Sequence, residues 1–167
     1  MPHVTVFPRV SLGLPLPLPA SASLSPQSRL TVDVRHPVDS VVAASLARRF
    51  AREAGLSAAS SAEVALVASE LATNLIRHTP KGGTLEVWRE DAWLVIRSTD
   101  RGPGMASPER LFAGREGRPG PLPGESLGEG GAAVRRLTDE VQVSNREGGG
   151  LEVVARKRMT FESRRFG

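Results

Sequence analysis

Residues 69–79 have the sequence SELATNLIRHT, which places charged and amide side chains within an otherwise apolar helical segment. The apolar residues in and before this stretch fall within one arc of about 100°, the width of a buried helix face: Val64, Ala68, Leu71, Ala72 and Leu75. Glu70, Asn74 and Arg77 fall on the opposite arc, with His78 at its margin, because steps of three and four residues return to one side of a helix. The pattern predicts a helix with one buried face and one polar face.

Two interpretations of this polar face stay open from the residues alone. The first is an ordinary solvated helix face. The second is a wall that binds a metal ion and phosphate. The amide oxygen of Asn74 is a suitable hard ligand for Mg²⁺, and Arg77 is suited to charge-assisted hydrogen bonds with phosphate. Glu70, one turn earlier, is placed to accept a proton from an attacking hydroxyl or water.

Apolar periodicity and turn residues predict the other elements. The second of two helices begins at Ser60, with Glu63 completing a capping box, and ends before Pro80. The predicted order is a strand from residue 29, helices 37–54 and 60–79, strands 84–90 and 93–99, a helix 130–138, and strands 141–146 and 151–157. This order predicts an α+β fold, a two-layer sandwich of a largely antiparallel mixed sheet with helices on one face.

The chain has 167 residues, enough for one domain with a substantial core. Proline clusters predict a disordered N-terminal tail over 1–28 and an irregular segment within the domain 29–158, before a basic tail over 159–167. No apolar run is long enough to cross a membrane. The absence of cysteine excludes disulfides and thiol chemistry and fits a reducing cytoplasm. The net charge is +4, but the arginines are scattered and tyrosine is absent, which argues against a nucleic-acid partner.

Two glycine-containing motifs follow the polar helix. Residues 100–105 have the sequence DRGPGM and follow a predicted strand. At the end of this strand, a buried Asp100 carboxylate can accept a hydrogen bond from an exocyclic amine, and the glycines let the backbone pass close to a flat base. Residues 128–130, GEG, precede a predicted helix, whose free N–H groups favour phosphate. Each motif alone also fits a simple turn or a hinge. Together with residues 69–79 they resemble, in order and spacing, the boxes of the GHKL (histidine-kinase-like, Bergerat-fold) ATPases, and residues 135–140, RRLTDE, resemble the RsbT/RsbW-type serine kinases.

This resemblance covers about residues 30–158 and implies a site for ATP and Mg²⁺. It implies that Asn74 binds Mg²⁺, that Glu70 takes the proton from a substrate serine, and that Asp100 binds adenine. The other positions that it implies in nucleotide binding are Arg77, His78, Gly102, Gly104, Gly128 and Gly130. Residues 105–127 correspond to the ATP lid. Arg115 and Arg118 are candidates within it for contact with the γ-phosphate.

The implied function is a cytoplasmic serine/threonine protein kinase that phosphorylates a STAS-domain antagonist in a bacterial partner-switching pathway. The alternative is a non-catalytic module that binds a STAS protein or a sigma factor, and the oligomeric state stays open, a homodimer included.

Three positions depart from the family pattern. Leu151 replaces a usual Thr and removes a hydroxyl contact with adenine, Ser126 stands where Gly is common, and Gly131 replaces an apolar residue. Residues 124–128 and 128–133 match a hydrolase elbow and a dinucleotide fingerprint, but no predicted strand precedes either.

Overall fold

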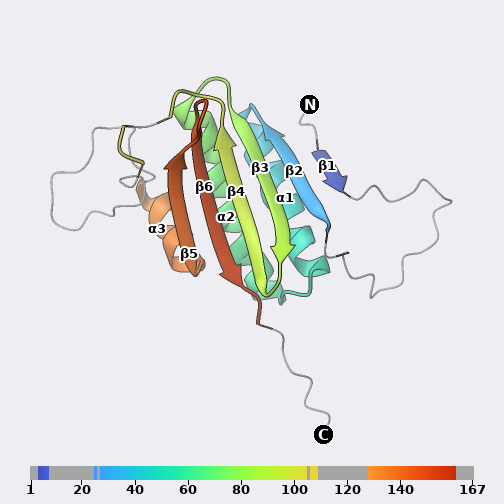
Figure 1. Cartoon of the computed structure of the whole chain (residues 1–167). Coiled ribbons are helices and arrows are strands. Elements are labelled where there is room, and N and C mark those ends of the chain that lie inside the picture. Colours follow the sequence, from blue (N-terminus) through green and yellow to red (C-terminus); the bar gives the residue numbers. More distant parts are fainter. Residues whose placement is uncertain (1–3, 8–24, 26, 105, 109–127, 161–167) are drawn as a thin grey trace, which may run out of the picture.

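The computed structural model describes residues 4–7, 25, 27–104, 106–108 and 128–160. Figure 1 labels the helices and strands along these residues. They are β1 (Val4–Phe7), β2 (Arg29–Val34), α1 (Pro37–Glu53), α2 (Ala58–His78), β3 (Gly83–Glu90), β4 (Trp93–Asp100), α3 (Gly128–Leu137), β5 (Glu140–Asn145) and β6 (Leu151–Arg158). From residue 29 onward the order agrees with the prediction, and the bounds differ by at most two residues.

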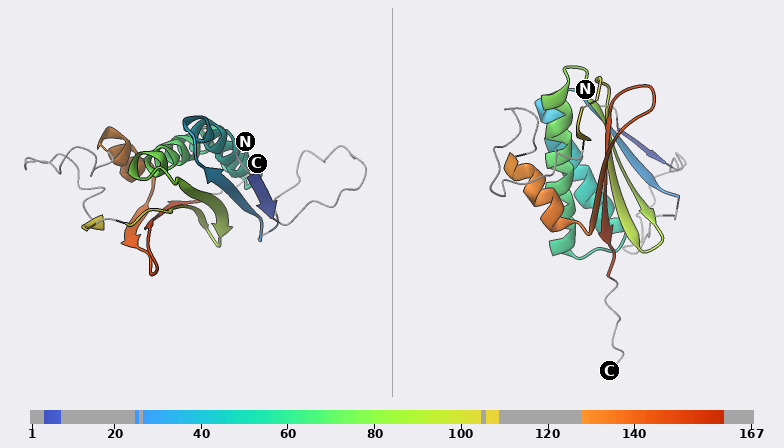
Figure 2. Two further views of the ribbon diagram at one scale, coloured as in Figure 1. Left: turned by 90° about the horizontal axis from the view of Figure 1, so that it is seen from above. Right: turned by 60° about the vertical axis from the view of Figure 1, so that its left-hand side comes forward.

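The strands form one six-stranded sheet in the order β1-β2-β3-β4-β6-β5. Figure 2 shows α1, α2 and α3 together on one face of this sheet, which confirms the predicted two-layer α+β fold. Every described strand pair is antiparallel, whereas a partly mixed sheet was expected. Because β6 rather than β5 pairs with β4, the start of β6 lies beside the end of β4, with Glu152 opposite Thr99.

Residues 4–7 differ from the prediction of a disordered tail over 1–28. They form β1, which adds to the edge of the sheet by pairing Val4 with Val32 and Phe7 with Arg29. The unpaired edge of β2 supplies the N–H and C=O groups that a further strand needs. The rest of the predicted N-terminal tail, apart from residues 25, 27 and 28, lies outside the described residues. The tail predicted over 159–167 is wrong at its start, because Met159 is buried and its N–H donates to the carbonyl of Ala92 at 2.7 Å. Residues 161–167 lie outside the described residues.

Local capping explains where the two long helices begin. Pro37 opens α1, and the Asp39 carboxylate accepts hydrogen bonds of 2.8 Å from the backbone N–H groups of Arg35 and His36. The predicted capping box of Ser60 with Glu63 is wrong. The helix α2 begins at Ala58, two residues before the predicted start at Ser60, because Ser57 is the N-cap and its hydroxyl oxygen accepts from the Ser60 N–H at 3.1 Å.

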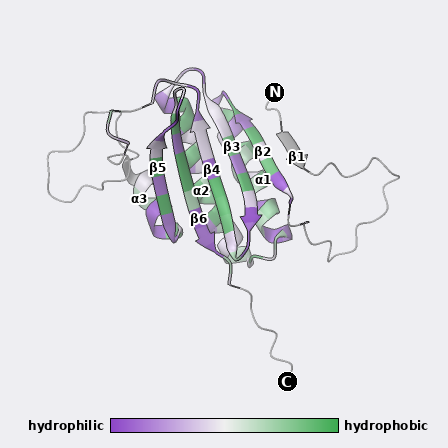
Figure 3. Cartoon of the chain, viewed as in Figure 1, coloured by the Kyte–Doolittle hydropathy of each residue, from purple (hydrophilic) through white to green (hydrophobic). Residues whose placement is uncertain are grey.

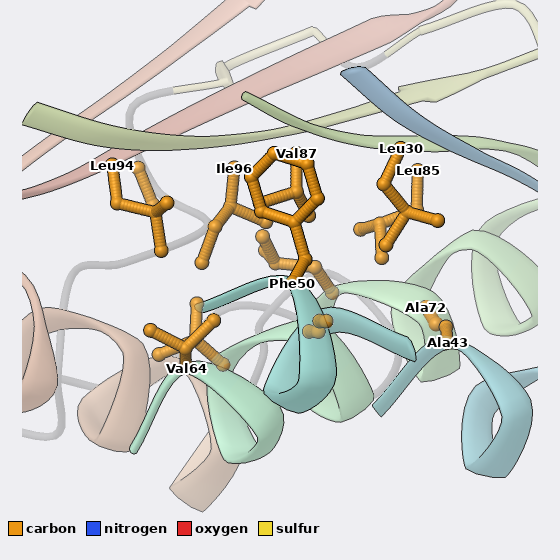
Figure 4. Packing of buried hydrophobic residues seen from close by; sticks show 14 of the residues in the cluster. Leu30, Ala43, Phe50, Val64, Ala72, Leu85, Val87, Leu94 and Ile96 are labelled. Carbon is orange, nitrogen blue, oxygen red and sulfur yellow. The ribbon is translucent and has the colours of Figure 1, made fainter. Parts of the chain in front are cut away.

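The core lies between the sheet and the helices α1 and α2. Figure 3 shows hydrophobic and hydrophilic residues alternating along the strands, which is the pattern of a sheet with one covered face. In Figure 4, Phe50 points from α1 toward the strands, where it meets side chains that point down from the sheet. The buried stripe predicted for α2 is confirmed, because Val64, Ala68, Leu71 and Ala72 are fully buried. This packing fixes the rotation of α2 about its axis.

None of the helices within the described residues is long and apolar enough to span a bilayer.

Candidate functional site

A small pocket lies between α2 and the ends of two neighbouring strands. Its lining comes from α2, from the end of β4 and from the start of β6: Leu71, Asn74, Leu75, His78, Ser98, Asp100, Leu151 and Val153. Three of the residues singled out in the sequence, Asn74, His78 and Asp100, are therefore brought together. They come from two elements that the chain separates by the hairpin partner β3, so only the folded sheet places them at one site.

Asn74 is the most unusual residue of this pocket. Its side chain is buried, and among the described residues its Nδ2 atom has no hydrogen-bond partner. A buried amide without a partner is rare in native structures and often marks the place of an ion, a water or a ligand. The Nδ2 group therefore has free donor capacity toward an acceptor bound in the pocket.

Asp100 is held in place by the turn that follows it. The carboxylate is 6% exposed, and its Oδ1 atom accepts a hydrogen bond of 2.9 Å from the Gly102 N–H. Since a carboxylate offers several acceptor positions, the remaining capacity, mainly at Oδ2, stays available for a donor. A Cβ on Gly102 would lie 3.0 Å from the Cβ of Thr79, so glycine allows the turn to pack against the residue after α2.

The turn between β5 and β6 packs against the end of β4 at Asp100. Gly148, Gly149 and Gly150 all have positive φ, at 89°, 108° and 95°, a conformation that glycine adopts without strain. A Cβ on Gly150 would collide with the carbonyl oxygen of Asp100. Gly104 also has positive φ, at 85°, and the Asn145 side chain occupies the space that a Cβ there would need. The turn thus fits closely around the end of β4.

His78 has an unusual electrostatic environment. Burial lowers its pKa below the ordinary 6.5, the negative charge of Asp100 opposes this shift, and the positive charge of Arg77 adds to it. The net direction is downward, so the imidazole is neutral at pH 7. A neutral imidazole both donates and accepts hydrogen bonds, which suits a residue that lines a polar pocket.

The predicted single polar wall on α2 is divided in the structure. Asn74 and His78 lie at the border of the buried stripe and line the pocket, whereas Arg77 is exposed and Glu70 is half-buried outside the lining. The reason is that the sheet covers a wide arc of α2, so the end of β4 reaches Asn74, which the helical wheel places on the polar arc, and His78 at the margin of that arc. The sequence could not show how far this coverage extends.

The glycines expected to contact phosphate begin a helix, as predicted. The helix α3 starts at Gly128, so both Gly128 and Gly130 lie in its first turn, where N–H groups have no partners within the helix. Most of the predicted lid, together with Arg115, Arg118 and Ser126, lies outside the described residues. Their predicted roles stay predictions.

The apolar wall of the pocket and the glycine turn that supports it were not predicted from the sequence. Leu151 was noted only as a departure, yet it is 4% exposed and lines the pocket beside Asp100, together with Val153. Three consecutive glycines at residues 148–150 were the signal that a backbone must come close to another segment here. Within the described residues no group of three or more His, Cys, Asp or Glu side chains forms a metal cage.

Comparison with known proteins agrees with this arrangement. A family model described as "Histidine kinase-like ATPase domain" matches residues 36–157. The serine/threonine-protein kinase RsbT of Bacillus subtilis (strain 168) is 32% identical over 122 residues, which cover 71% of this chain and 88% of RsbT. The family match runs from the start of α1 almost to the end of β6 and includes every residue that lines the pocket.

Proposed function

Because the chain belongs to the histidine kinase-like ATPase family and is of the RsbT type, we propose that it is an ATP-dependent serine/threonine protein kinase. Its substrate is a serine of a STAS-domain antagonist in a bacterial partner-switching pathway. The main support from the structure is that the unpartnered amide of Asn74 and the buried carboxylate of Asp100 line one pocket. The relative RsbT, itself named a serine/threonine-protein kinase, supports the reaction type.

In this proposal Asp100 selects adenine. Its free acceptor position receives the exocyclic amine of the base, a donor that guanine lacks at the corresponding position. Gly102 and Gly104 allow the backbone to approach the flat ring. Leu151 and Val153 supply apolar contact with the base. Since Leu151 has no hydroxyl group, selectivity for adenine depends strongly on the Asp100 carboxylate.

The amide oxygen of Asn74 would hold a Mg²⁺ ion that is shared with phosphate. Mg²⁺ keeps several waters and takes few protein ligands in nucleotide sites, so one amide oxygen is sufficient without a carboxylate cage. When bound, Mg²⁺ neutralises charge on the phosphate oxygens. Arg77, which is exposed, and the N–H groups at the start of α3, near Gly128 and Gly130, are assigned to phosphate binding. The neutral imidazole of His78 is assigned to a hydrogen bond within the site.

Glu70 is assigned as the general base of the transfer. It lies one helical turn before Asn74 and is half-buried, which leaves it accessible to a substrate hydroxyl. The serine oxygen forms a bond with the γ-phosphorus while the bond from that phosphorus to the β–γ bridging oxygen breaks. The serine proton passes to Glu70, and ADP leaves with the bridging oxygen. Glu70 returns the proton to solvent.

The test separates catalysis from binding. Wild type, Glu70→Gln and Asp100→Asn are compared for the heat of Mg²⁺–ATP binding and for transfer of radiolabelled phosphate to a STAS protein encoded beside this chain. Glu70→Gln is expected to lower transfer by about 10²-fold or more while ATP still binds. Asp100→Asn is expected to lose ATP binding, because the amide presents a donor to the adenine amine.

The matched control is Glu53→Gln, which removes a carboxylate from an exposed ion pair on α1 and is expected to change neither quantity. If the wild-type chain binds the STAS protein and ATP but transfers no phosphate, the proposed kinase activity is contradicted. That result supports the alternative of a nucleotide-binding regulator. A wild-type chain that gives no heat with Mg²⁺–ATP contradicts the nucleotide site itself.

A further inference from the structure

Arg101, the residue after Asp100, joins three segments at the end of the sheet. Its backbone N–H donates to the carbonyl of Gly82 at 3.0 Å. Its guanidinium donates to the carbonyl of Lys81 at 3.2 Å, to the hydroxyl of Thr84 at 3.3 Å and to the carboxylate of Asp33. One side chain therefore ties the end of β4 to the turn before β3, to β3 itself and to the end of β2.

The turn that Arg101 holds is the continuation of α2. The Gly82 N–H donates to the carbonyl of Thr79 at 3.1 Å, and the Lys81 N–H donates to the hydroxyl of Thr79 at 3.2 Å. A Cβ on Gly83, the first residue of β3, would meet the backbone of residues 99 and 100 and the side chain of Leu75, so β3 begins directly against the end of β4 and against α2. The turn at residues 79–82 therefore connects the end of α2 to the strand that pairs with Asp100.

Asp33 gives Arg101 a fixed anchor. It lies opposite Thr84 in the β2–β3 pairing, and its second oxygen accepts a hydrogen bond of 2.8 Å from the Arg35 side chain. Burial opposes ionisation of this carboxyl group, but hydrogen bonds and charge from Arg101, and then from Arg35, outweigh burial and lower its pKa below 3.8. The pair is thus fully charged at neutral pH.

We propose that Arg101 and Asp33 form a positioning pair for the nucleotide site. Through the turn at residues 79–82, the pair fixes the Asp100 carboxylate relative to Asn74 and His78, and so determines how strictly the site selects adenine. The proposal rests on the proposed function, since it assumes that Asp100 binds the base. Neither member of the pair lines the pocket, so both act through Asp100 and through the end of α2.

The contacts of Arg101 distinguish this pair from an ordinary surface ion pair. The Arg101 and Asp33 side chains are 38% and 17% exposed, whereas Arg49 and Glu53 on α1 are 74% and 41% exposed. The Arg101 guanidinium also donates to a backbone carbonyl and a hydroxyl group, while Arg49 meets one glutamate four residues away. Arg49→Met is therefore a matched control that removes a guanidinium without touching the turn.

The experiment compares wild type, Arg101→Met, Arg101→Lys, Asp33→Asn, Arg49→Met and the double variant of Asp33→Asn with Arg101→Met. Calorimetry with Mg²⁺ measures the Kd for ATP and for GTP. Arg101→Met is expected to weaken ATP binding about tenfold and to reduce the preference for ATP over GTP by a similar factor. Arg101→Lys is expected to recover part of the preference, because one ammonium replaces only some of the contacts. Asp33→Asn combined with Arg101→Met is expected to be no worse than Arg101→Met alone.

A second measurement, on the protein without nucleotide, tests whether Arg101 and Asp33 position the Asp100 carboxylate. The Gly102 N–H donates to Asp100, so its amide resonance reports the position of that carboxylate. Because Gly102 directly follows Arg101, the deciding variant is Asp33→Asn: a shift of this resonance in Asp33→Asn, but not in Arg49→Met, supports the pair. An unshifted Gly102 resonance together with an unchanged ATP-to-GTP preference overturns it. If wild type binds no ATP, the proposed function fails, and the resonance alone decides whether the pair positions Asp100. If Arg101→Met does not fold, Arg101→Lys and Asp33→Asn decide the same question.

Discussion

Replacing Gly150 with alanine tests the close fit between the β5–β6 turn and the end of β4. Gly150 has φ at 95°, and a Cβ added there would collide with the carbonyl oxygen of Asp100. Gly148 is the matched control. It lies in the same turn with φ at 89°, but a Cβ added there would meet nothing within 4 Å. The two substitutions therefore share the backbone strain and differ in the collision.

The structure gives the expected size of this difference. Positive φ costs an alanine about 1–2 kcal/mol at either position. The gain from a less flexible unfolded chain is also the same for both and cancels in the comparison. The collision at Gly150 adds about 1–3 kcal/mol, the usual effect of overpacking. Gly148→Ala should therefore lower the free energy of unfolding by about 1–2 kcal/mol, and Gly150→Ala by about 2–5 kcal/mol.

Urea denaturation followed by tryptophan fluorescence measures both values, because Trp88 and Trp93 lie on adjacent strands of the sheet. Gly150→Ala should also weaken ATP binding, since the displaced carbonyl belongs to the residue assigned to adenine, whereas Gly148→Ala should not. Equal losses of stability in the two variants, with equal ATP affinity, would refute the close fit. A larger loss for Gly148→Ala would show that strain, and not the collision, dominates this turn.

Two further predictions concern groups outside the glycine turn. Lys157, 14% exposed, donates to Glu63 of α2 at 2.7 Å and to the carbonyl of Leu137 at the end of α3 at 2.9 Å. Lys157→Met should lower the free energy of unfolding by about 1–2 kcal/mol. The exposed control Arg49→Met should lower it by about 0.5 kcal/mol or less. Equal losses in urea titrations would contradict the role of Lys157 in holding α2 and α3 together. Burial lowers the pKa of His78 below 6.5, so the unfolded chain binds more protons there than the folded chain. The contribution of His78 to the free energy of unfolding is therefore complete above pH 6.5 and is lost as the pH falls below 6.5. In urea titrations at several pH values, His78→Gln should not show this loss of stability at low pH. The same pH profile for wild type and His78→Gln would disprove the prediction.

Much of the candidate site was predictable because its motifs are local. Asp100 was found from the strand end and the glycines after it, since a turn of this kind depends on nearby residues. The division of the polar face on α2 was not predictable. A helical wheel gives the angle between Asn74 and Arg77, but the sheet decides how much of the helix it covers, and that depends on strands elsewhere in the chain.

The elements from residue 29 onward follow from the sequence alone, because apolar periodicity, proline and glycine act within a few residues, whereas β1 depends on its pairing with β2. The helix α2 is an example: its buried stripe and its end before Pro80 are both visible in the sequence. Strand pairing brought together what the sequence separates. Arg101 meets Asp33 across 68 residues, and Leu151 meets the pocket because β6 pairs with β4. Such contacts depend on which strands become neighbours, and this choice is made by the burial of the whole sheet rather than by any one segment.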